Sequence, residues 1–221
     1  MKKLLALASL LLVGALPVAF PVASYGFTGI GAEPVGGAPI APMDGWVVDA
    51  PHTEINFSVK HFFTPVTGTF DDFELTLEYD AENPENSYVE VRIAVASVNS
   101  GNQRRDNHLR TADFFAADEH PYITFHSTSV SKKSDGTLVA RGPLSIRGVT
   151  KEVALPIKLL GVQSIPEEMR EMLGGAREIA SFQMSTTIDR GDFGVGTGSW
   201  AATLVVGGEV TINILVEAHR K

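Results

Sequence analysis

The sequence predicts an all-β protein, an antiparallel β-barrel or sandwich that carries one or two short helices. Three observations lead to this fold class. Many segments alternate apolar and polar side chains with a period of two, as strands with one dry and one wet face do. Short turns rich in Gly, Asp and Pro separate these segments. One charged segment, residues 104–115, instead spaces its apolar residues as a helix does.

The N-terminal part of the chain is expected to lie outside the barrel. Two lysines precede an apolar run over residues 4–16, and small residues lead to a cleavage site after Ser24, so residues 1–24 are typical of a secretory signal peptide. An uncleaved anchor is the weaker alternative, because a bilayer core needs about 20 apolar residues. Residues 25–45, rich in Gly and Pro, indicate a flexible leader, and the folded domain is expected over residues 46–221.

Three strands are expected before the charged segment. They cover residues 54–61, 73–80 and 89–95, and in each of them apolar side chains recur at every second position. Gly68 stands just before Phe70, where a bend or bulge is expected.

The segment from Arg104 to Phe115 is predicted to be a short helix laid across the sheet or closing one end of a barrel. Leu109, Ala112 and Phe115 recur at helical spacing, and Pro121 ends anything helical. Its charged residues could hold the polar head of a ligand. A network of ion pairs that pins the helix to the barrel is the favoured alternative, because acidic residues within the segment can neutralise its arginines.

The second half of the chain is predicted to return to strands. They cover residues 122–130, 138–146 and 153–159, with tight turns at Asp135-Gly136 and Arg147–Thr150. Alternation resumes at Phe182, Met184 and Ile188. The total is roughly eight to ten strands.

Two later segments have their own predictions. Residues 161–177 are expected to form a short helical excursion, because Ser164 and Glu167 have the spacing of a helix cap and Gly174-Gly175 would end the helix. The chain is then expected to close with a hairpin, in which a strand from Trp200 to Val206 turns at Gly207-Gly208 into a strand over residues 210–216.

Composition excludes several functions. The 221 residues carry 18 Lys and Arg against 26 Asp and Glu, a net charge of −8, and loss of two lysines with residues 1–24 would take it to −10. An acidic domain is repelled by phosphate backbones, so a nucleic-acid partner is not expected. Without cysteine, the domain can have no thiol catalysis, thiolate metal site or lipoprotein anchor, and its stability must come from a full hydrophobic core.

No catalytic or metal-binding residues are predicted. The sequence lacks a G-x-S-x-G motif and any histidine pair with HxH or HExxH spacing. His61 lies on the apolar side of its strand, where a core histidine is the usual interpretation. The Gly-rich loop 194–198 leads into a predicted strand rather than a helix, which favours a rim loop over a phosphate loop.

Aromatic residues are the most informative side chains, because many of them lie on or beside apolar faces. They are Phe57, Phe70, Phe73, Phe114, Phe115, Phe125, Phe182 and Trp200. In a sandwich they would fill the core, whereas in a hollow barrel they would line an apolar cavity, and the sequence leaves both alternatives open.

Several motifs, in order, resemble those of the YceI-like family over roughly residues 45–217. They are Trp46…Asp49…His52…Ile55-x-Phe57-x-Val59-Lys60-His61, Val66-x-Gly68-x-Phe70, Arg105-Asp106-x-His108-Leu109-Arg110-x-x-Asp113-Phe114-Phe115, Pro121-x-x-Thr124-Phe125-x-Ser127-Thr128, Gly142-x-Leu144-x-Ile146-Arg147-Gly148-Val149-Thr150-Lys151 and Asp192-Phe193-Gly194-Val195. The acidic helical stretch 161–177 departs from the family, which more often has a shorter loop there.

The resemblance implies a lipocalin-like barrel with an elongated apolar cavity, in a bacterial periplasmic or secreted protein without catalysis. The expected cargo is a polyisoprenoid, isoprenoid quinone or fatty amide, with no other cofactor and no membrane span after signal cleavage, and a homodimer is compatible with it. A filled barrel acting as a stress-related or interaction module without cargo is the alternative. Strand alternation places Phe57, Val59, Phe70, Leu75, Phe125, Leu144, Met184 and Trp200 in the wall, and the resemblance suggests Arg105, Asp106 and His108 for the polar end.

Overall fold

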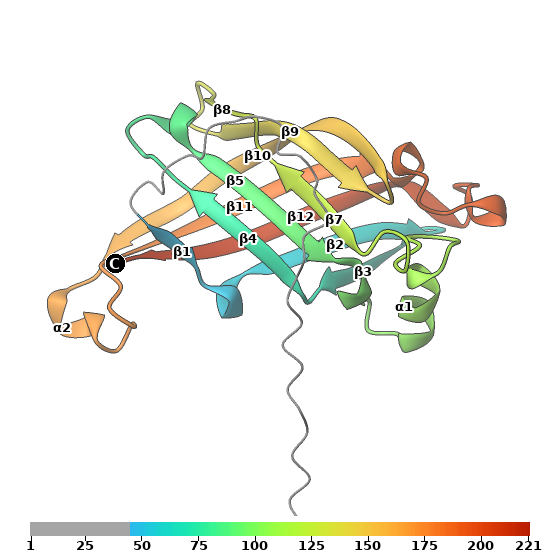
Figure 1. Cartoon of the computed structure of the whole chain (residues 1–221), viewed down its shortest axis with the longest axis horizontal. Coiled ribbons are helices and arrows are strands. Elements are labelled where there is room, and N and C mark those ends of the chain that lie inside the picture. The colour runs from blue at the N-terminus through green and yellow to red at the C-terminus, as the bar shows by residue number, and fades with distance from the viewer. Residues whose placement is uncertain (1–44) are drawn as a thin grey trace, which may run out of the picture. The chain divides into compact units, whose positions relative to one another are not determined.

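The computed structural model describes residues 45–221, which form a 12-stranded antiparallel sheet that curls into a β-barrel (Figure 1). The strands are β1 Trp46–Val48, β2 Glu54–His61, β3 Thr64–Phe70, β4 Phe73–Glu78, β5 Tyr88–Ala94, β6 Val98–Asn99, β7 Tyr122–His126, β8 Ser129–Lys132, β9 Leu138–Ile146, β10 Val149–Ser164, β11 Glu178–Asp189 and β12 Val206–Arg220. The helices are α1 Gln103–Arg110 and α2 Glu167–Arg170, and five 3-10 turns are η1 Ala50–His52, η2 Pro84–Asn86, η3 Val95–Ser97, η4 Arg190–Phe193 and η5 Gly198–Trp200. The predicted all-β fold class is confirmed.

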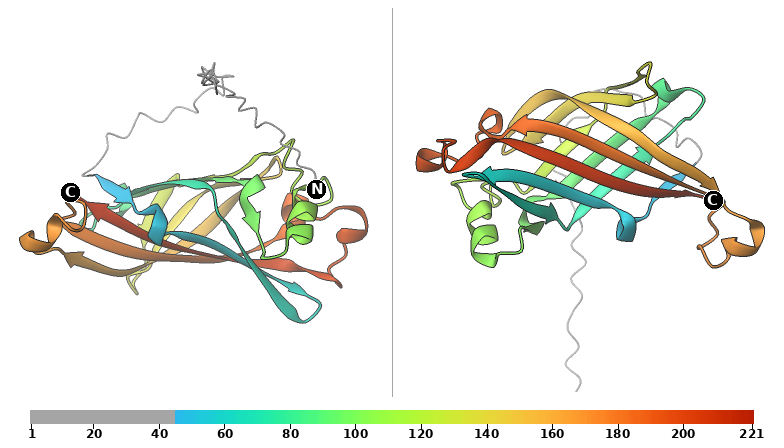
Figure 2. Two further views of the ribbon diagram at one scale, coloured as in Figure 1. Left: turned by 90° about the horizontal axis from the view of Figure 1, so that it is seen from below. Right: turned by 180° about the vertical axis from the view of Figure 1, so that it is seen from behind.

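The sheet runs in the order β4-β5-β7-β9-β10-β11-β12-β2-β3-β6, while β1 pairs with β12 and β8 pairs with β9. Hydrogen bonds outside the ladders also hold the curled sheet together near its β4 edge. The Trp46 indole N–H donates to the Tyr79 carbonyl over 3.2 Å, which joins β1 to the end of β4. At the corner between β3 and β4, the Ala94 N–H donates to the Asp72 carbonyl over 2.9 Å. The curled sheet is seen from three sides in Figures 1 and 2.

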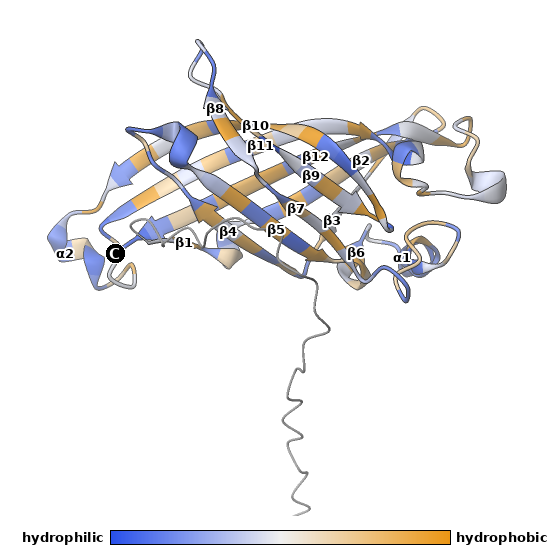
Figure 3. Ribbon diagram, turned by 45° about the horizontal axis from the view of Figure 1, so that its top comes forward, coloured by the Kyte–Doolittle hydropathy of each residue, from blue (hydrophilic) through white to orange (hydrophobic). Residues whose placement is uncertain are grey.

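Alternation along the strands divides inside from outside, as expected. In β5, for example, Val89, Val91 and Ile93 are buried while Glu90 is exposed. The same alternation of apolar and polar residues follows the strands in Figure 3. The turn between β9 and β10 has positive φ at both Arg147 and Gly148, which matches the twist that a two-residue hairpin requires.

Three strand predictions need correction. Residues 122–130 form two strands, β7 and β8, that both pair with β9. The closing hairpin is wrong: β12 is one continuous strand, and Gly207-Gly208 lies at a shift in its register with β2, between Val206 and Val210. Trp200 belongs instead to a 3-10 turn, because its carbonyl is held by a buried arginine described below.

Both helices are shorter than predicted. Helix α1 ends at Arg110, where Thr111 turns extended and its hydroxyl donates to the His108 carbonyl, so Phe114 and Phe115 follow in turns. Before α2, strand β10 continues to Ser164, and Pro166 rather than Ser164 stands at the N-cap. The positive φ angles of Gly174 and Gly175 lie beyond the end of α2, near where a helix end was expected.

The barrel has two distinct ends. Helix α1 and the turns η4 and η5 lie at one end, and α2, β1 and the C-terminus lie at the other (Figure 1). We name them the α1 end and the α2 end. At the α2 end the interior is closed by rings: Tyr79 contacts Phe182 edge-on with centroids 5.2 Å apart, and Trp46 lies 6.4 Å from Tyr79.

Candidate ligand-binding cavity

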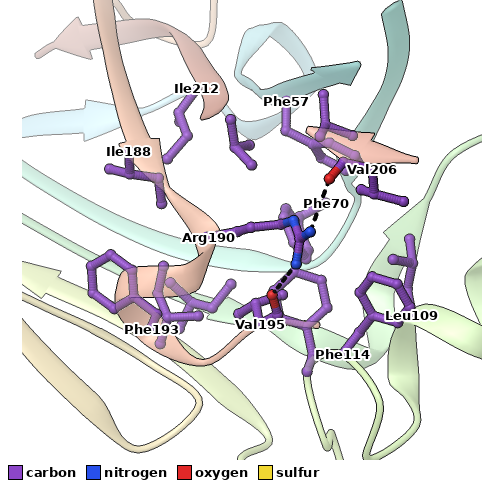
Figure 4. Close-up of a pocket in the computed structure, with 15 residues that line it drawn as sticks. Phe57, Phe70, Leu109, Phe114, Ile188, Arg190, Phe193, Val195, Val206 and Ile212 are labelled. Carbon is purple, nitrogen blue, oxygen red and sulfur yellow. Dashed lines mark hydrogen bonds between the residues drawn. The ribbon is translucent and has the colours of Figure 1, made fainter. Parts of the chain in front are cut away.

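An apolar cavity of about 110 Å³ lies inside the barrel near the α1 end (Figure 4). Its walls come from β2, β3, β7, β9, β11 and β12, from α1 and from the turns that follow α1 and β11. The lining residues are Phe57, Val59, Phe70, Leu109, Phe114, Phe115, Ile123, Ile146, Ile188, Arg190, Phe193, Val195, Val206, Val210 and Ile212. The surface that they present is entirely apolar, so the cavity suits a hydrocarbon rather than a polar molecule.

Two further spaces adjoin this cavity. A deeper apolar cavity of about 80 Å³ shares Phe57, Phe70 and Ile212 with it and is also lined by Phe125 and Leu144. Toward the outside, a mouth of about 570 Å³ shares several walls with the first cavity and adds polar residues from β2 and α1. These three adjoining spaces range from a polar mouth to an apolar interior, and together we call them the passage.

Gly68, which has no side chain, makes room for the Phe57 ring in the wall of the cavity. A Cβ at Gly68 would lie 2.5 Å from Cζ of Phe57, so the Phe57 ring lies over Gly68, 5.6 Å from the Phe70 ring. The register of β2 and β3 runs without a break from Asn56↔Thr69 to His61↔Thr64. The bulge predicted as one alternative at Gly68 is therefore wrong, the bend stays a prediction, and close packing against Phe57 explains the need for a glycine.

A buried arginine holds the rim of the cavity together. Arg190 is 4 % exposed, and its guanidinium donates to the carbonyls of Val195, Trp200, Val206 and Gly207 over 2.7–2.9 Å. Figure 4 shows the bonds to Val195 and Val206. Burial lowers the pKa of Arg190, and neighbouring Asp189 opposes this. Because its donors are satisfied by carbonyls, Arg190 fixes the loop between β11 and β12 around the cavity.

The polar residues of α1 are held mainly by the backbone. Arg105 donates to the hydroxyl and carbonyl of Ser100, and the Asp106 carboxylate accepts from the same residue. Arg110 donates to the carbonyls of Ala96 and Val98 over 2.8 and 2.9 Å. The favoured network of ion pairs is thus wrong for these arginines: α1 is pinned to the barrel by arginine-to-carbonyl hydrogen bonds.

The mouth combines aromatic rings with free cations. The His108 ring contacts Phe114 and Trp200 edge-on, both with centroids 5.0 Å apart, and His108 lies 3.0 Å from the Asp113 carboxylate. Lys60 and Arg104 also line the mouth, are exposed, and make no ion pair within residues 45–221. Both can therefore contact a negatively charged group of a bound molecule.

Most of the residues predicted for the site lie along this passage. Phe57, Val59, Phe70, Phe125 and Leu144 line the two apolar cavities, and Trp200, Arg105 and His108 line the mouth. Three do not line any of the three spaces. Leu75 packs against the core elsewhere, Met184 is 1 % exposed within the filled part of the barrel, and Asp106 is buried against Ser100.

Sequence reasoning missed some lining residues and misplaced a histidine. Ile123, Ile146 and Ile212 each line both apolar cavities. Arg190 was missed too, although it follows Ile188 by two residues and so continues the inward face of its strand. His61 is exposed at the mouth with its ring 4.9 Å from that of Phe62, so its interpretation as a core histidine is wrong.

A cluster of ionisable side chains lies away from the cavity, at the α2 end. Asp49 on the loop after β1 contacts His52 over 2.8 Å and His219 over 3.3 Å, and His219 lies 3.1 Å from Glu217. Ligand atoms of Asp49, Glu217 and His219 lie within 4.8 Å of one another. Hydrogen bonds between imidazoles and carboxylates satisfy these groups and tie the start of the domain to β12.

Residues 46–218 match the YceI-like domain family, which is almost the whole of the described chain. The chain belongs to the YceI-like family. It is 35 % identical to a UPF0312 protein of Azotobacter vinelandii, covering 84 % of this chain and 92 % of the relative. A similar protein of Ectopseudomonas mendocina is also 35 % identical, covering 75 % of this chain and 83 % of the relative. The resemblance identified from the motifs is confirmed.

Solved structures place the YceI-like barrel among known folds. The YCEI protein of Campylobacter jejuni superposes with a TM-score of 0.61 at 32 % identity, over 81 % of this chain and 99 % of that one. BcnA of Burkholderia cenocepacia gives a TM-score of 0.69 at 23 % identity, over 77 % and 99 %. A polyisoprenoid-binding domain of Saccharophagus degradans gives 0.55 at 14 % identity, over 80 % and 98 %. The last two likenesses establish the fold alone.

Within residues 45–221, neither helix has the length and apolar character to cross a membrane. The signal peptide predicted over residues 1–24 and, apart from Gly45, the leader predicted over residues 25–45 lie outside the described residues and stay predictions.

Proposed function

We propose that this YceI-like protein binds and carries a polyisoprenoid or a similar long-chain amphiphile in the bacterial periplasm. The observation that carries the proposal is the passage from a polar mouth to two adjoining apolar cavities of about 110 and 80 Å³. The Saccharophagus domain described as polyisoprenoid-binding has the same fold, which supports it. The periplasmic location rests on the predicted signal peptide.

Burial of hydrocarbon is sufficient to explain binding. Each methylene transferred from water contributes about 0.8 kcal/mol, so a five-carbon prenyl unit contributes at most about 4 kcal/mol before ordering costs. An engineered apolar cavity of about 150 Å³ accepts benzene, so the two cavities hold on the order of one or two prenyl units. The rest of a longer chain would lie in the mouth, where Lys60 and Arg104 are placed to contact an anionic head group.

The proposal is of a binding protein and not of an enzyme. The expected cargo classes are a polyisoprenoid, an isoprenoid quinone or a fatty amide, because each joins a long apolar chain to a small polar group. The alternative of a barrel filled throughout does not fit the α1 end, although it describes the α2 end. Selectivity among the cargo classes would follow from the length of the cavities and from the cations at the mouth.

Native mass spectrometry of the protein purified from its own host, followed by organic extraction, tests this proposal. A co-purifying mass of a prenyl chain, quinone or fatty amide is expected. Ile212→Trp should abolish uptake of added prenol, because Ile212 lines both apolar cavities, whereas Ile212→Leu keeps the volume and should keep uptake. A bare protein that takes up no prenyl lipid, or a tryptophan variant that binds as the wild type does, would overturn the proposal.

A further inference from the structure

Three large apolar side chains project into solvent beside the mouth of the cavity. Phe62 and Phe63 form the turn between β2 and β3 and are 51 % and 95 % exposed, and Leu204 in the loop before β12 is 78 % exposed. We name these three residues the apolar tip. A fully exposed phenylalanine at a turn does not contribute to the hydrophobic core, so the reason for its exposure must lie in its surroundings.

The backbone holds the apolar tip in place. The Phe62 N–H donates to the Val205 carbonyl over 2.8 Å, which joins the β2–β3 turn to the loop that carries Leu204. Phe62 also adopts a left-handed φ of 53°, a conformation that is costly for a bulky residue and persists only where neighbouring structure imposes it. The turn therefore presents its two rings to solvent as part of the fold.

The apolar tip lies at the rim of the mouth. Its neighbours in sequence, Lys60, His61 and Val206, all line the mouth, and His61 pairs with Val206 in the sheet. Figure 1 shows the β2–β3 turn at the same end of the barrel as α1. The α1 end thus brings together an apolar passage, projecting aromatic rings and the cations Lys60 and Arg104.

We propose that the apolar tip docks the mouth onto a phospholipid bilayer, so that a lipid chain passes between membrane and cavity without crossing water. The inference rests on the proposed function, because only an apolar cargo requires such a route. Aromatic rings insert at the membrane interface. Lys60 and Arg104 complement lipid phosphates there, although the chain as a whole is acidic with a net charge of −8.

A protein partner fits this surface less well. Stable protein interfaces bury about 1,200 Å² or more, which is more than three side chains at a loop tip supply. A bilayer needs no complementary shape, and a few inserted rings next to cations suffice for reversible attachment. The continuity of the apolar tip with the mouth also places a membrane where the cargo would enter.

The test measures transfer and solution binding separately. Vesicles of phosphatidylethanolamine and phosphatidylglycerol carrying a fluorescent prenol serve as donors, and a short-chain prenol dissolved without vesicles measures cavity affinity. Phe63→Asp should slow transfer from vesicles by about tenfold or more and leave the affinity in solution unchanged. Met172→Asp is the matched control, because Met172 is 73 % exposed at the α2 end and should change neither quantity.

The outcomes separate this inference from the proposed function. Equal transfer rates for wild type and Phe63→Asp would overturn docking by the apolar tip while leaving the cavity proposal intact. Loss of prenol binding in solution by Phe63→Asp would also overturn docking by the apolar tip, since Phe63 would then belong to the cavity. A wild type that binds no prenol in solution contradicts the proposed function itself. If circular dichroism shows that Phe63→Asp does not fold, Leu204→Asp is measured by the same criteria.

Discussion

The two ends of this barrel are built from the same strands but have opposite interiors. At the α1 end the interior holds cavities of about 110 and 80 Å³, whereas the interior void beside Tyr79 and Phe182, toward the α2 end, is about 10 Å³. Strand β11 passes through both: Phe182 and Met184 are 1 % exposed in the filled part, and Ile188 lines the cavity. An inward-facing side chain therefore does not always line a cavity, because its position along the strand decides which residues surround it.

The placement of aromatic rings explains the difference. At the α2 end the rings of Trp46, Tyr79 and Phe182 contact one another across the lumen and leave no space for a ligand. At the α1 end the Phe57 ring lies over Gly68 on the neighbouring strand. Rings at the α1 end thus line the passage instead of filling it.

The largest expected effect comes from truncating one ring at each end. Phe182→Ala should lower the free energy of unfolding by about 3–5 kcal/mol, because the ring is fully buried and its neighbours cannot all collapse into the space. Phe57→Ala should cost clearly less, because its ring already borders empty space, but it should change prenol affinity. Urea unfolding and prenol binding of both variants measure this contrast. Equal losses of stability, or a loss of affinity only in Phe182→Ala, would contradict the distinction between the ends.

A smaller effect on stability is expected from narrowing the cavity at the α1 end. A Cβ in Gly68→Ala would lie 2.5 Å from Phe57 Cζ and 2.7 Å from the Asn99 carbonyl oxygen, and only the ring can move. We expect a loss of about 1–3 kcal/mol from overpacking and weaker prenol uptake as the ring moves into the lumen. Gly161→Ala is the control, because no atom lies within 4 Å of its added Cβ. Unchanged uptake in Gly68→Ala would show that Phe57 does not set the width of the passage.

The fold was largely predictable because it depends on a local pattern. Period-two alternation identified the strands that contain Phe57, Leu75 and Val91, and positive φ at Gly136 and Gly148 agrees with two predicted turns. The failures occurred where tertiary contacts override local signals. Gly207-Gly208 has the sequence of a turn, but β12 continues through it as one strand whose register with β2 shifts there, and the Gly207 carbonyl accepts a hydrogen bond from Arg190.

The site was less predictable because alternation predicts the face of the sheet from which a side chain projects but not the residues that surround it. Met184 and Phe57 have equally apolar inward positions in sequence, yet one is packed in the core and the other borders a cavity. Arg105 and Arg110 resemble ligand-binding cations until their carbonyl partners are known. Only coordinates show that Arg104 and Lys60 are the cations left free at the mouth within residues 45–221.

The smallest expected effect is a pH dependence of stability confined to the α2 end. Hydrogen bonding to Asp49, with the charges of Asp49 and Glu217, raises the pKa of His52 above its ordinary value of 6.5. His219 completes this cluster. Protonated His52 therefore favours the folded state, and its contribution is fully present below about pH 6.5 and is lost as the pH rises through the raised pKa.

Replacing this histidine isolates its contribution. The difference in melting temperature between wild type and His52→Gln should be larger at mildly acidic than at alkaline pH, with prenol affinity unchanged at both. The effect should be small, because the His52 side chain is 67 % exposed and water screens its charge. His126→Gln, an exposed strand histidine outside the cluster, is the control. If the difference in melting temperature does not depend on pH, protonated His52 does not help to tie the start of the domain to β12. A change in prenol affinity would show that the α2 end influences binding at the α1 end.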